Sequence, residues 1–446
     1  MKREQLLWLL TAAAGARPLL EYQQGTKFDY PGLRFDYDRK FHITMFNDLH
    51  LADGGVLPYR PDADDKTIGV MNAVLNSEPN TDLVILNGDL ISCEWVAPED
   101  ANKHIDKIMQ PLLDRQLPWG TTFGNHDYSK TCNVRLMSEH QWDVGNANGR
   151  QLTWTTSSVT GDYNQVGSSN YYIPIYDSAG GGNPNLKMII WLFDSKGGRK
   201  YQPQGEDESI ADWVDERVIS WFRLTRDQLN QDHGKTIPSI AFVHIPPHVT
   251  EAFQRKGGRT STQEPGLNEE VISHQGNVCD PSGHNCDYAG KDIPFMEALV
   301  ETEGLMAVFS GHDHKVDWCM KWSATKPVPN NQPAKGNGMH FCFGRHTGYG
   351  GYSDYARGGR HIVIEEDKLG QSVLETWIRL EDGTISGKVT LNATFGYDQY
   401  PAVKKTKTTG SIGDISDSGV SVENKPDTTT TTDNQTKAEG QADAQA

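Results

Sequence analysis

The sequence predicts an α/β fold in which sheets of short buried strands are covered by helices. Between about Lys40 and Glu366, short apolar runs, several rich in Ile and Val, alternate with segments of helical periodicity or loop composition. The chain has 446 residues and is 36% hydrophobic, which is enough material for a sizeable core in one large domain or two of ordinary size. A third observation is that polar clusters follow directly after several of the apolar runs.

The individual elements follow from these patterns. The expected strands are the apolar runs Phe41–Phe46, Leu83–Leu86, Trp119–Phe123, Met188–Phe193, Ile240–Val243, Met306–Phe309 and His340–Phe343. Apolar residues at helical spacing predict helices over Thr67–Ser77 and Trp213–Gln231. The segments Gly145–Ser169 and Arg255–Gly290 are rich in Gly, Ser, Thr and Asn, and we expect long surface loops there, close to the functional site.

The two ends of the chain differ from the middle. Met1-Lys2-Arg3, an apolar run from Leu6 to Ala14 and the small residues Ala14-Gly15-Ala16 predict a secretory signal peptide over residues 1–16, with a short buried helix as the alternative. No stretch has the length of a membrane-spanning helix, so no membrane span is expected. Residues 401–446 lack apolar periodicity and are predicted to form a disordered tail, which leaves one domain over residues 36–400.

Charge and cysteine content narrow the class of protein. The formal net charge of −17 argues against a nucleic-acid binder, which would carry a basic stripe. Six cysteines suit an oxidising compartment and, with the leader, favour a secreted protein or one of the secretory pathway. Only the Cys279–Cys286 pair is predicted from spacing. His284 lies between these two cysteines, but three ligands are one short of a closed zinc site.

Polar clusters follow five of the expected strands. They are Asp48-Leu49-His50, Gly88-Asp89, Gly124-Asn125-His126-Asp127, the single His244, and Gly311-His312-Asp313-His314. Open α/β sheets bind ligands outside the carboxyl ends of their strands, so these clusters should meet at one place. A single histidine of this kind would more often be a core or surface residue. Five occurrences in one chain indicate a catalytic site.

The residue types in these clusters suit a pair of metal ions. A carboxylate such as Asp89 can bridge two ions, and the amide oxygen of Asn125 can complete a ligand shell without adding charge. Imidazoles suit zinc and iron, and carboxylates also accept manganese. A water that bridges two such ions loses a proton near neutral pH and becomes a nucleophile, while the adjacent His126 can give a proton to a leaving group.

These motifs, in this order, resemble the calcineurin-like metallophosphoesterase superfamily over Phe41–Thr347. The segments Gly167–Tyr172 and Gly344–Tyr352 look like a eukaryotic, largely fungal branch that is similar to plant proteins classed with the purple acid phosphatases. The resemblance implies a four-layer fold, in which two β-sheets pack as a sandwich flanked by helices and the site lies at the strand ends. It also makes residues 36–400 the metallophosphoesterase domain.

The resemblance further implies a role for each motif residue. The first metal would be held by Asp48, His50, Asp89 and His314, and the second by Asp89, Asn125, His244 and His312. Asp89 would bridge the two metals, and His126 would protonate or stabilise the leaving oxygen. Two divalent or mixed-valence ions are therefore expected, with iron, zinc and manganese left open.

This sequence departs from the purple acid phosphatases at two positions. Those enzymes carry a tyrosine three residues after the bridging aspartate, where this chain has Ser92, and their first motif lacks the histidine that is present here as His50. A tyrosinate-bound ferric ion and a purple colour are therefore not expected.

Three further residues have two interpretations each. Asp127 either orients His126 or is a solvated turn residue. Arg345 either grips phosphate oxygens in two places or forms a structural salt bridge. His248 lines the pocket or faces solvent; Pro246 and Pro247 exclude a helix that would pair it with His244.

The leading functional hypothesis is two-metal hydrolysis of phosphomonoesters, whether small molecules or phosphoproteins, with Arg345 holding the phosphate. The alternative is a phosphodiesterase that acts on cyclic nucleotides, phospholipid head groups or nucleic acid. A non-catalytic scaffold that binds phosphorylated partners is disfavoured because the catalytic groups are complete.

Overall fold

The computed structural model describes residues 32–53, 62–178, 184–256, 258–279, 286–323 and 336–408. The predicted signal peptide, His284 and the tail beyond residue 408 lie outside the described residues. Residues 401–408, the start of the predicted tail, are described, and Lys407 forms an isolated β-bridge with Tyr355. The domain boundaries remain predictions.

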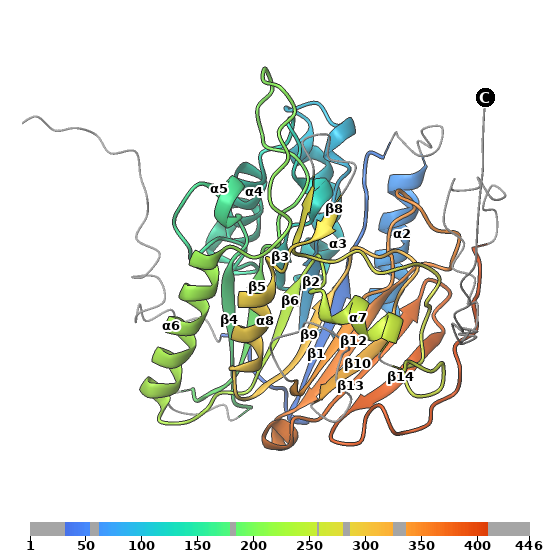
Figure 1. Ribbon diagram of the computed structural model, residues 1–446. Helices are drawn as coiled ribbons and strands as arrows, with labels where there is room; N and C mark the ends of the chain where they lie inside the picture. Colours follow the sequence, from blue (N-terminus) through green and yellow to red (C-terminus); the bar gives the residue numbers. More distant parts are fainter. Residues whose placement is uncertain are drawn as a thin grey trace, which may run out of the picture. The chain divides into compact units, whose positions relative to one another are not determined.

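Two six-stranded sheets form the centre of the described chain (Figure 1). The first sheet has the order β14-β13-β12-β1-β2-β3 and the second the order β10-β11-β9-β6-β5-β4. The strands of the first are β1 (Lys40–Phe46), β2 (Leu83–Asn87), β3 (Trp119–Thr122), β12 (Gly358–Glu365), β13 (Leu374–Leu380) and β14 (Ile385–Leu391). Those of the second are β4 (Tyr171–Tyr176), β5 (Leu186–Phe193), β6 (Ser239–Val243), β9 (Leu305–Ser310), β10 (Cys319–Ser323) and β11 (Asn337–Phe343). A separate hairpin joins β7 (Asn277–Cys279) to β8 (Cys286–Tyr288).

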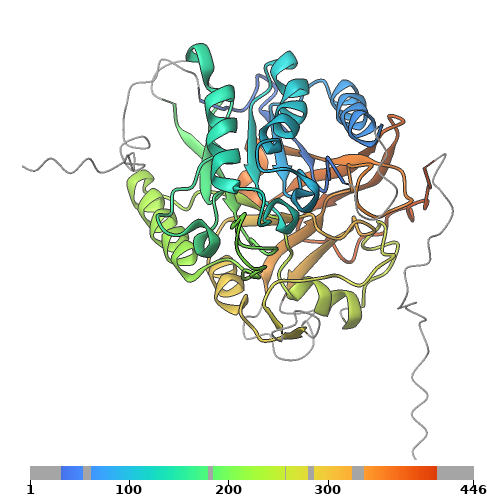
Figure 2. The ribbon, with the colours of Figure 1, turned by 90° about the horizontal axis from the view of Figure 1, so that it is seen from above.

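Helices cover the outer faces of both sheets. They are α2 (Ala63–Ser77), α3 (Ala101–Arg115), α4 (Val134–Gly145), α5 (Tyr163–Val166), α6 (Glu216–His233), α7 (Val249–Lys256) and α8 (Ile293–Val300). Buried side chains of α2, α3 and α4 pack on the first sheet, and those of α6, α7 and α8 pack on the second. Figure 2 shows the blue and cyan helices on the opposite side of the strands from the green and gold ones. The predicted fold, two packed sheets flanked by helices, is confirmed.

The strand β2 shows why these segments are continuous apolar runs. Leu83 and Ile85 face the core between the two sheets, while Val84 and Leu86 face the core beneath the helices. Both faces of the strand are therefore buried, and every position is apolar up to Asn87. β6 repeats the pattern, which is why the runs could be found from sequence.

The helix α6 begins three residues later than predicted. The side chain of Asp215 accepts a hydrogen bond from the backbone N–H of Arg217 and caps the helix at Glu216. Val214, which was included in the predicted helix, is buried in the segment that precedes the cap. Gly234 then ends the helix in the left-handed region.

The two predicted loop segments are less open than expected. The segment Gly145–Ser169 contains the short helix α5. Thr153 and Thr155, which precede α5 in this segment, are fully buried. Arg255–Gly290 includes the end of α7 and the β7–β8 hairpin. Their polar composition reflects side chains that satisfy buried backbone groups: Thr155, for example, accepts from the N–H of Thr121 in β3.

All six cysteines are described and all are paired. The predicted Cys279–Cys286 disulfide closes the β7–β8 hairpin. Cys93–Cys132 and Cys319–Cys342 join segments 39 and 23 residues apart, and spacing had not predicted them.

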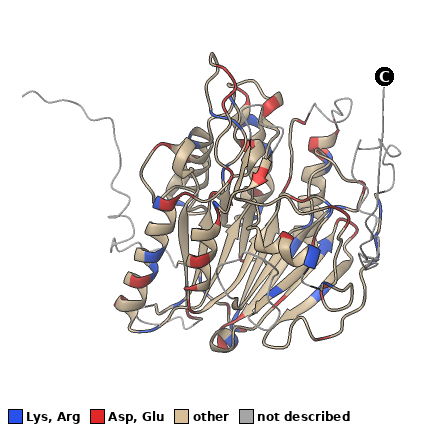
Figure 3. Ribbon diagram, in the orientation of Figure 1, with Lys and Arg blue, Asp and Glu red and all other residues tan. Residues whose placement is uncertain are grey.

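Figure 3 shows Lys and Arg positions interspersed with Asp and Glu positions along the helices and loops of the described chain. A search of the described helices finds none that is long and apolar enough to cross a membrane.

Candidate metal centre

The functional side chains come from the carboxyl ends of parallel strands in both sheets. β1, β2 and β3 run parallel in the first sheet, and Asp48, His50, Asp89 and Asn125 follow them. β6 and β9 run parallel in the second sheet, and His244, His312 and His314 follow them. We call these seven residues the ligand cluster. Strand ends of both sheets thus deliver ligands to one edge of the sandwich.

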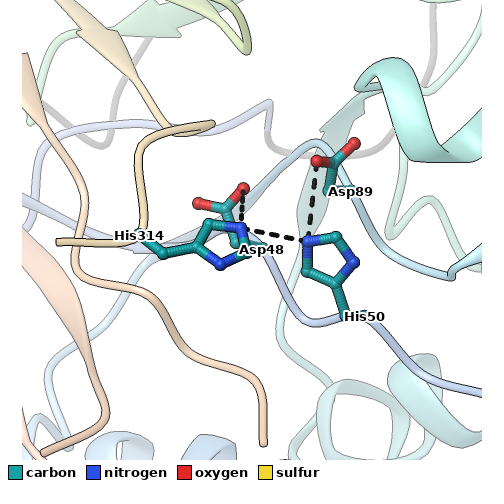
Figure 4. A group of neighbouring side chains, drawn as sticks. All are labelled: Asp48, His50, Asp89 and His314. Atoms are coloured by element: carbon teal, nitrogen blue, oxygen red, sulfur yellow. Dashed lines mark hydrogen bonds and ion pairs between the residues drawn. The ribbon is translucent and has the colours of Figure 1, made fainter. Parts of the chain in front are cut away.

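The first group of ligands consists of Asp48, His50, Asp89 and His314, all buried, with one ligand atom of each within 4.8 Å of the others. Nε2 of His50 lies 3.1 Å from Nε2 of His314 and 3.6 Å from Oδ2 of Asp89. Nε2 of His314 lies 3.6 Å from Oδ1 of Asp48 (Figure 4). The four side chains point toward one another from three different loops.

The second group shares Asp89 with the first and adds His244 and His312. Nε2 of His244 lies 3.1 Å from Oδ2 of Asp89 and 3.9 Å from Oδ1 of Asp48. The ring centroids of His244 and His312 are 5.4 Å apart. One carboxylate therefore belongs to two ligand groups, which is the arrangement that a bridging ligand requires.

Unpartnered polar atoms test whether the residues fit metal ions. Within the described chain, three buried atoms of the ligand cluster have no hydrogen-bond partner: Oδ1 of Asn125, Nε2 of His244 and Nδ1 of His312. Buried polar atoms are normally paired because losing their hydration costs free energy. All three atoms can donate a lone pair to a cation, and they belong to the predicted second-metal set. The donor atoms of the second group therefore fit a metal ion.

The backbone at the ligands is held in an uncommon conformation. Asp48, His50, Asp89 and His312 have φ angles of 53°, 48°, 50° and 77°, in the left-handed region that residues other than glycine seldom occupy. Such conformations persist where the surrounding structure enforces them, and they cluster at functional sites.

The motif glycines allow the ligands to come this close. A Cβ at Gly124 would lie 2.3 Å from Oδ1 of Asp89, and one at Gly88 would lie 2.3 Å from Nδ1 of His244. Gly88 also has a φ of +85°. The two glycines are thus required by the close packing around Asp89.

The histidines are oriented by their Nδ1 atoms. Nδ1 of His244 donates to the carbonyl of Asn87 at 2.8 Å, and Nδ1 of His314 donates to that of Tyr352 at 2.7 Å. A carbonyl only accepts, so in the neutral form of each ring Nε2 carries the lone pair and faces the ligand group. His50 makes the equivalent contact with Oγ of Ser92 at 3.0 Å. The two departures from the purple acid phosphatase pattern are therefore in direct contact with each other.

Burial sets the charge of the cluster. It lowers the pKa of His50 to about 4 and that of His312 to about 3, and it holds the pKa of His314 well below its usual value. These imidazoles are neutral at neutral pH, which is the form that binds metal. Burial raises the pKa of Asp48 to about 7. It would also raise that of Asp89, but the neighbouring His244 and His126 hold the pKa of Asp89 well below its ordinary value. Burial lowers the pKa of His244, but Asp89 outweighs this and raises it to about 10, so a metal ion bound at Nε2 of His244 would displace a proton.

His126 stands beside the ligand cluster and is 41% exposed. Its ring centroid is 4.9 Å from that of His50, and its Nδ1 lies 2.5 Å from Oε1 of Glu94. Burial lowers the pKa of His126, but Asp89 and the hydrogen bond to Glu94 outweigh this and raise it to about 9. Sequence reasoning missed Glu94, because no local pattern connects it to a histidine 32 residues away. The Cys93–Cys132 disulfide ties Glu94's turn to the segment after His126.

Asp127 is not the solvated turn residue of its two predicted alternatives, and its contact with the His126 loop runs through the backbone. It is fully buried, so it is not a solvated turn residue, and its carboxylate accepts three backbone N–H groups instead of a bond from the His126 ring. Oδ1 accepts from Leu90 and Ile91, and Oδ2 accepts from Gly124. Asp127 thereby joins the loop of Asp89 to the loop of Asn125 and His126.

Arg345 is buried and is engaged by partners outside the ligand cluster. Its Nε and Nη2 both contact Oδ2 of Asp317, at 2.7 and 2.6 Å, and its Nη1 donates to the carbonyl of Ala356 at 3.0 Å. The side chain is 2% exposed. This geometry is the structural salt bridge of the two predicted alternatives, and we leave Arg345 out of the proposed mechanism.

Comparison with known proteins agrees with this geometry. The calcineurin-like phosphoesterase family profile matches residues 41–316. The chain is 25% identical over 377 residues to "Probable inactive purple acid phosphatase 14" of Arabidopsis thaliana, a match that covers 78% of this chain and 83% of the plant protein. It is 27% identical over 351 residues to "Phosphatase DCR2" of Saccharomyces cerevisiae, covering 76% of this chain and 54% of the yeast protein.

Among solved structures, a dimetal phosphatase from Danio rerio aligns with a TM-score of 0.44 at 11% identity, over 79% of this chain and 98% of that one. The predicted resemblance to purple-acid-phosphatase-like and fungal proteins is confirmed by the plant and yeast relatives. With the family profile matching more than half of its length, the chain belongs to the calcineurin-like phosphoesterase family.

Proposed function

We propose that the protein hydrolyses phosphomonoesters with two metal ions held by the ligand cluster. The observation that carries the proposal is the position of Asp89 in two ligand groups at once, with donor atoms of the second group buried and unpartnered. Structural polar clusters satisfy their own hydrogen bonds. This one leaves three buried atoms that can bind a cation without a hydrogen-bond partner among the described residues.

The protein supplies the ligands in two sets. Asp48, His50, Asp89 and His314 would hold one ion, and Asp89, Asn125, His244 and His312 the other. When bound, two such ions polarise phosphoryl oxygens and favour the deprotonation of water. Their identity among iron, zinc and manganese is open, although the four imidazoles favour zinc or iron at one position at least.

His126 is proposed to donate a proton to the leaving oxygen. Its Nδ1 is engaged by Glu94, so Nε2 is the nitrogen available to a substrate. The partial exposure of the ring gives a substrate access to it. The backbone N–H of His126 donates to Oδ1 of Asp89 at 2.8 Å, which fixes the ring's loop relative to the shared carboxylate.

The name of the plant relative, which calls it inactive, favours one other candidate, a phosphate-binding protein without turnover. Against that candidate, this chain retains every predicted ligand and His126. The yeast relative is named a phosphatase, which supports the catalytic proposal. Diester hydrolysis would use the same groups, and the experiment below separates it from monoester hydrolysis.

The test compares wild-type protein with Asp89→Asn, and with Asp114→Asn on the exposed face of α3 as the matched control. Metal content is measured by elemental analysis, and rates are measured on a phosphate monoester and a diester with the same aryl leaving group. We expect Asp89→Asn to lose bound metal and about 1,000-fold or more in monoester rate, because it removes a ligand from both ions. Asp114→Asn should match wild type. Fully metallated wild-type protein without monoester activity would refute the proposal, and a faster diester rate would reassign the substrate class.

We also propose that the protein belongs to the secretory pathway. The pairing of all six cysteines supports an oxidising compartment. Sequencing the N-terminus of protein expressed from its full reading frame tests the proposal. A mature chain that begins near residue 17 is expected, and retention of Met1 in a cytosolic, reduced protein would contradict it.

A further inference from the structure

Outside the ligand cluster, a second group of metal-ligating side chains converges at His248, Glu251 and His274. One ligand atom of each residue lies within 4.8 Å of the others. We propose that these residues, here called the His–Glu–His group, form a third site for a divalent cation of the zinc type.

The three side chains present suitable atoms to one another. His248 immediately precedes α7 and Glu251 lies in its first turn, and Nε2 of His248 is 3.5 Å from Oε2 of Glu251. His274 comes from the segment before β7. Its Nδ1 donates to the carbonyl of Gln275 at 2.9 Å, which leaves the lone pair on Nε2. This is the tautomer in which a histidine binds a metal ion through Nε2.

Neighbouring residues fix His248 in place. The carboxylate of Asp292 accepts the backbone N–H of His248 at 2.8 Å and the hydroxyl of Tyr288 at 2.9 Å. The Tyr288 ring stacks on that of His248 with centroids 3.7 Å apart and planes 23° apart. Tyr288 belongs to the β7–β8 hairpin, which the Cys279–Cys286 disulfide closes. The His248 side chain is therefore held in place before a metal ion binds to it.

The chemistry of the group favours a cation over an anion. The carboxylate of Glu251 beside the two imidazoles would repel a phosphate. Burial lowers the pKa of His274, so its imidazole is neutral at neutral pH and can act as a ligand. Arg255 pairs with Oε1 of Glu251, while Oε2 is the oxygen that faces His248. Two histidines and one glutamate are a ligand set found in zinc sites that keep a fourth position open.

The site is accessible and lies beside loops of the ligand cluster without sharing a residue with it. The side chains of His248 and Glu251 are 13% and 12% exposed. Ser273 donates its backbone N–H to Asp313, between His312 and His314, at 2.9 Å. Gln275 donates from Nε2 to the carbonyl of Ile245, next to His244, at 2.7 Å. The two sites can therefore be emptied separately by mutation.

The experiment counts zinc in the full chain. Metal-stripped protein is titrated with zinc against a chromophoric chelator, and the bound zinc is checked by elemental analysis. His274→Asn and the isosteric Glu251→Gln are each expected to bind one zinc fewer per chain than wild type. His233→Asn, at the exposed end of α6, is the matched control and should bind as much zinc as wild type. Circular dichroism verifies that each variant is folded.

The outcomes separate this inference from the proposed function. Asp89→Asn should lose zinc from the ligand cluster and keep the zinc that is lost in His274→Asn, so the double variant should lose both. If His274→Asn and Glu251→Gln, both folded, bind as much zinc as wild type, the His–Glu–His group is a hydrogen-bonded cluster and the inference is overturned. If they lose one zinc while the wild-type protein hydrolyses no phosphoester, the inference holds and the proposed function fails.

Discussion

Two buried polar regions of this molecule differ in whether their polar atoms have hydrogen-bond partners. In the ligand cluster, Asn125, His244 and His312 each carry a buried atom without a partner, and four ligands have left-handed backbone. The second region, here called the arginine cluster, consists of Arg345, Asp317 and Arg360. There, Arg360 donates to the carbonyls of Phe343 and Asp317 and to the hydroxyl of Thr376. Arg345 donates to Asp317 and Ala356.

The difference separates a site from a scaffold. Both regions are buried and both follow strands, so the position of Arg345 in the sequence does not distinguish it from the predicted metal ligands. Their hydrogen-bond partners distinguish the two regions: Nε, Nη1 and Nη2 of Arg345 are engaged by Asp317 and Ala356, whereas three atoms of the ligand cluster have no partner in the described part of the chain and can bind a cation. Four predictions test this distinction, from the largest expected effect to the smallest.

Removing Arg345 should damage stability and spare chemistry. Arg345→Leu leaves the buried carboxylate of Asp317 without its ion-pair partner, and the free energy of unfolding should fall by about 3–5 kcal/mol, as measured by urea denaturation. The kcat of the folded fraction should stay within about threefold of wild type. The double variant Arg345→Leu with Asp317→Leu should recover part of the stability. A large fall in kcat at unchanged stability would instead assign Arg345 to phosphate binding.

Removing the hydroxyl of Ser92 should weaken the metal centre itself. Ser92→Ala takes away the partner of His50 Nδ1, and loss of such an orienting contact typically costs about 10- to 100-fold in metal affinity. The measurement is a chelator-competition titration. Ser138→Ala is the control, since Ser138 is also buried and donates its hydroxyl to a carbonyl, that of Thr155. Equal metal affinity in Ser92→Ala and wild type would show that the Ser92–His50 contact is incidental.

Glu94→Gln should disturb His126 without touching the metal ligands. We expect kcat to fall about tenfold with KM nearly unchanged, because the acid would be less well oriented. Burial lowers the pKa of His126, whereas the charges of Asp89 and Glu94 raise it. Losing the Glu94 charge should therefore lower this pKa and move the basic limb of the kcat profile to lower pH. Glu94→Asp should rescue part of the activity, and the exposed Glu99→Gln should have no effect. A pH profile identical to wild type would exclude the positioning role.

Asp64 supports the loop that carries His50, and replacing it should have the smallest effect of the four substitutions. It accepts the backbone N–H of Ala52 at 2.9 Å and a bond from Lys107 at 3.0 Å. Burial alone would raise its pKa, but the hydrogen bonds of His104, Ala52 and Lys107 lower it to about 2. A depressed carboxyl pKa stabilises the fold above the unfolded value and loses this effect as pH falls from about 4 to about 2.

Asp64→Asn should therefore cost about 1–2 kcal/mol at pH 7, after allowance for solvent screening, and progressively less below about pH 4. Urea unfolding at pH 7, 5 and 3.5 measures the trend. A stability loss that does not change with pH would mean that the charge of Asp64 plays no part.

Sequence reasoning reached the fold and most of the candidate site through local signals. β2 and β6 were recognisable because both of their faces are buried, and the ligands because each follows such a strand. The Cys279–Cys286 pair was recognisable because it closes a short turn. Helix starts were less well placed, since the cap at Asp215 depends on a single side-chain contact.

Contacts between distant segments were beyond these signals. Nothing near Glu94 in the sequence indicates His126, and nothing near Cys93 indicates Cys132. The same holds for Ser92: the sequence shows only that it replaces the tyrosine of the purple acid phosphatases, and its contact with His50 depends on the tertiary structure.

By itself, the sequence determined which residues have the chemistry to bind metal and where each strand would present them, because side-chain type and periodicity are local properties. The tertiary structure alone decided that Asp89 lies in both ligand groups, that Arg345 forms an ion pair with Asp317 and that His248, Glu251 and His274 lie close together. Those facts depend on the order of strands within two sheets and on the packing of loops between them. Segments hundreds of residues apart are brought together by burial of their apolar faces, and only then do their polar ends become a site.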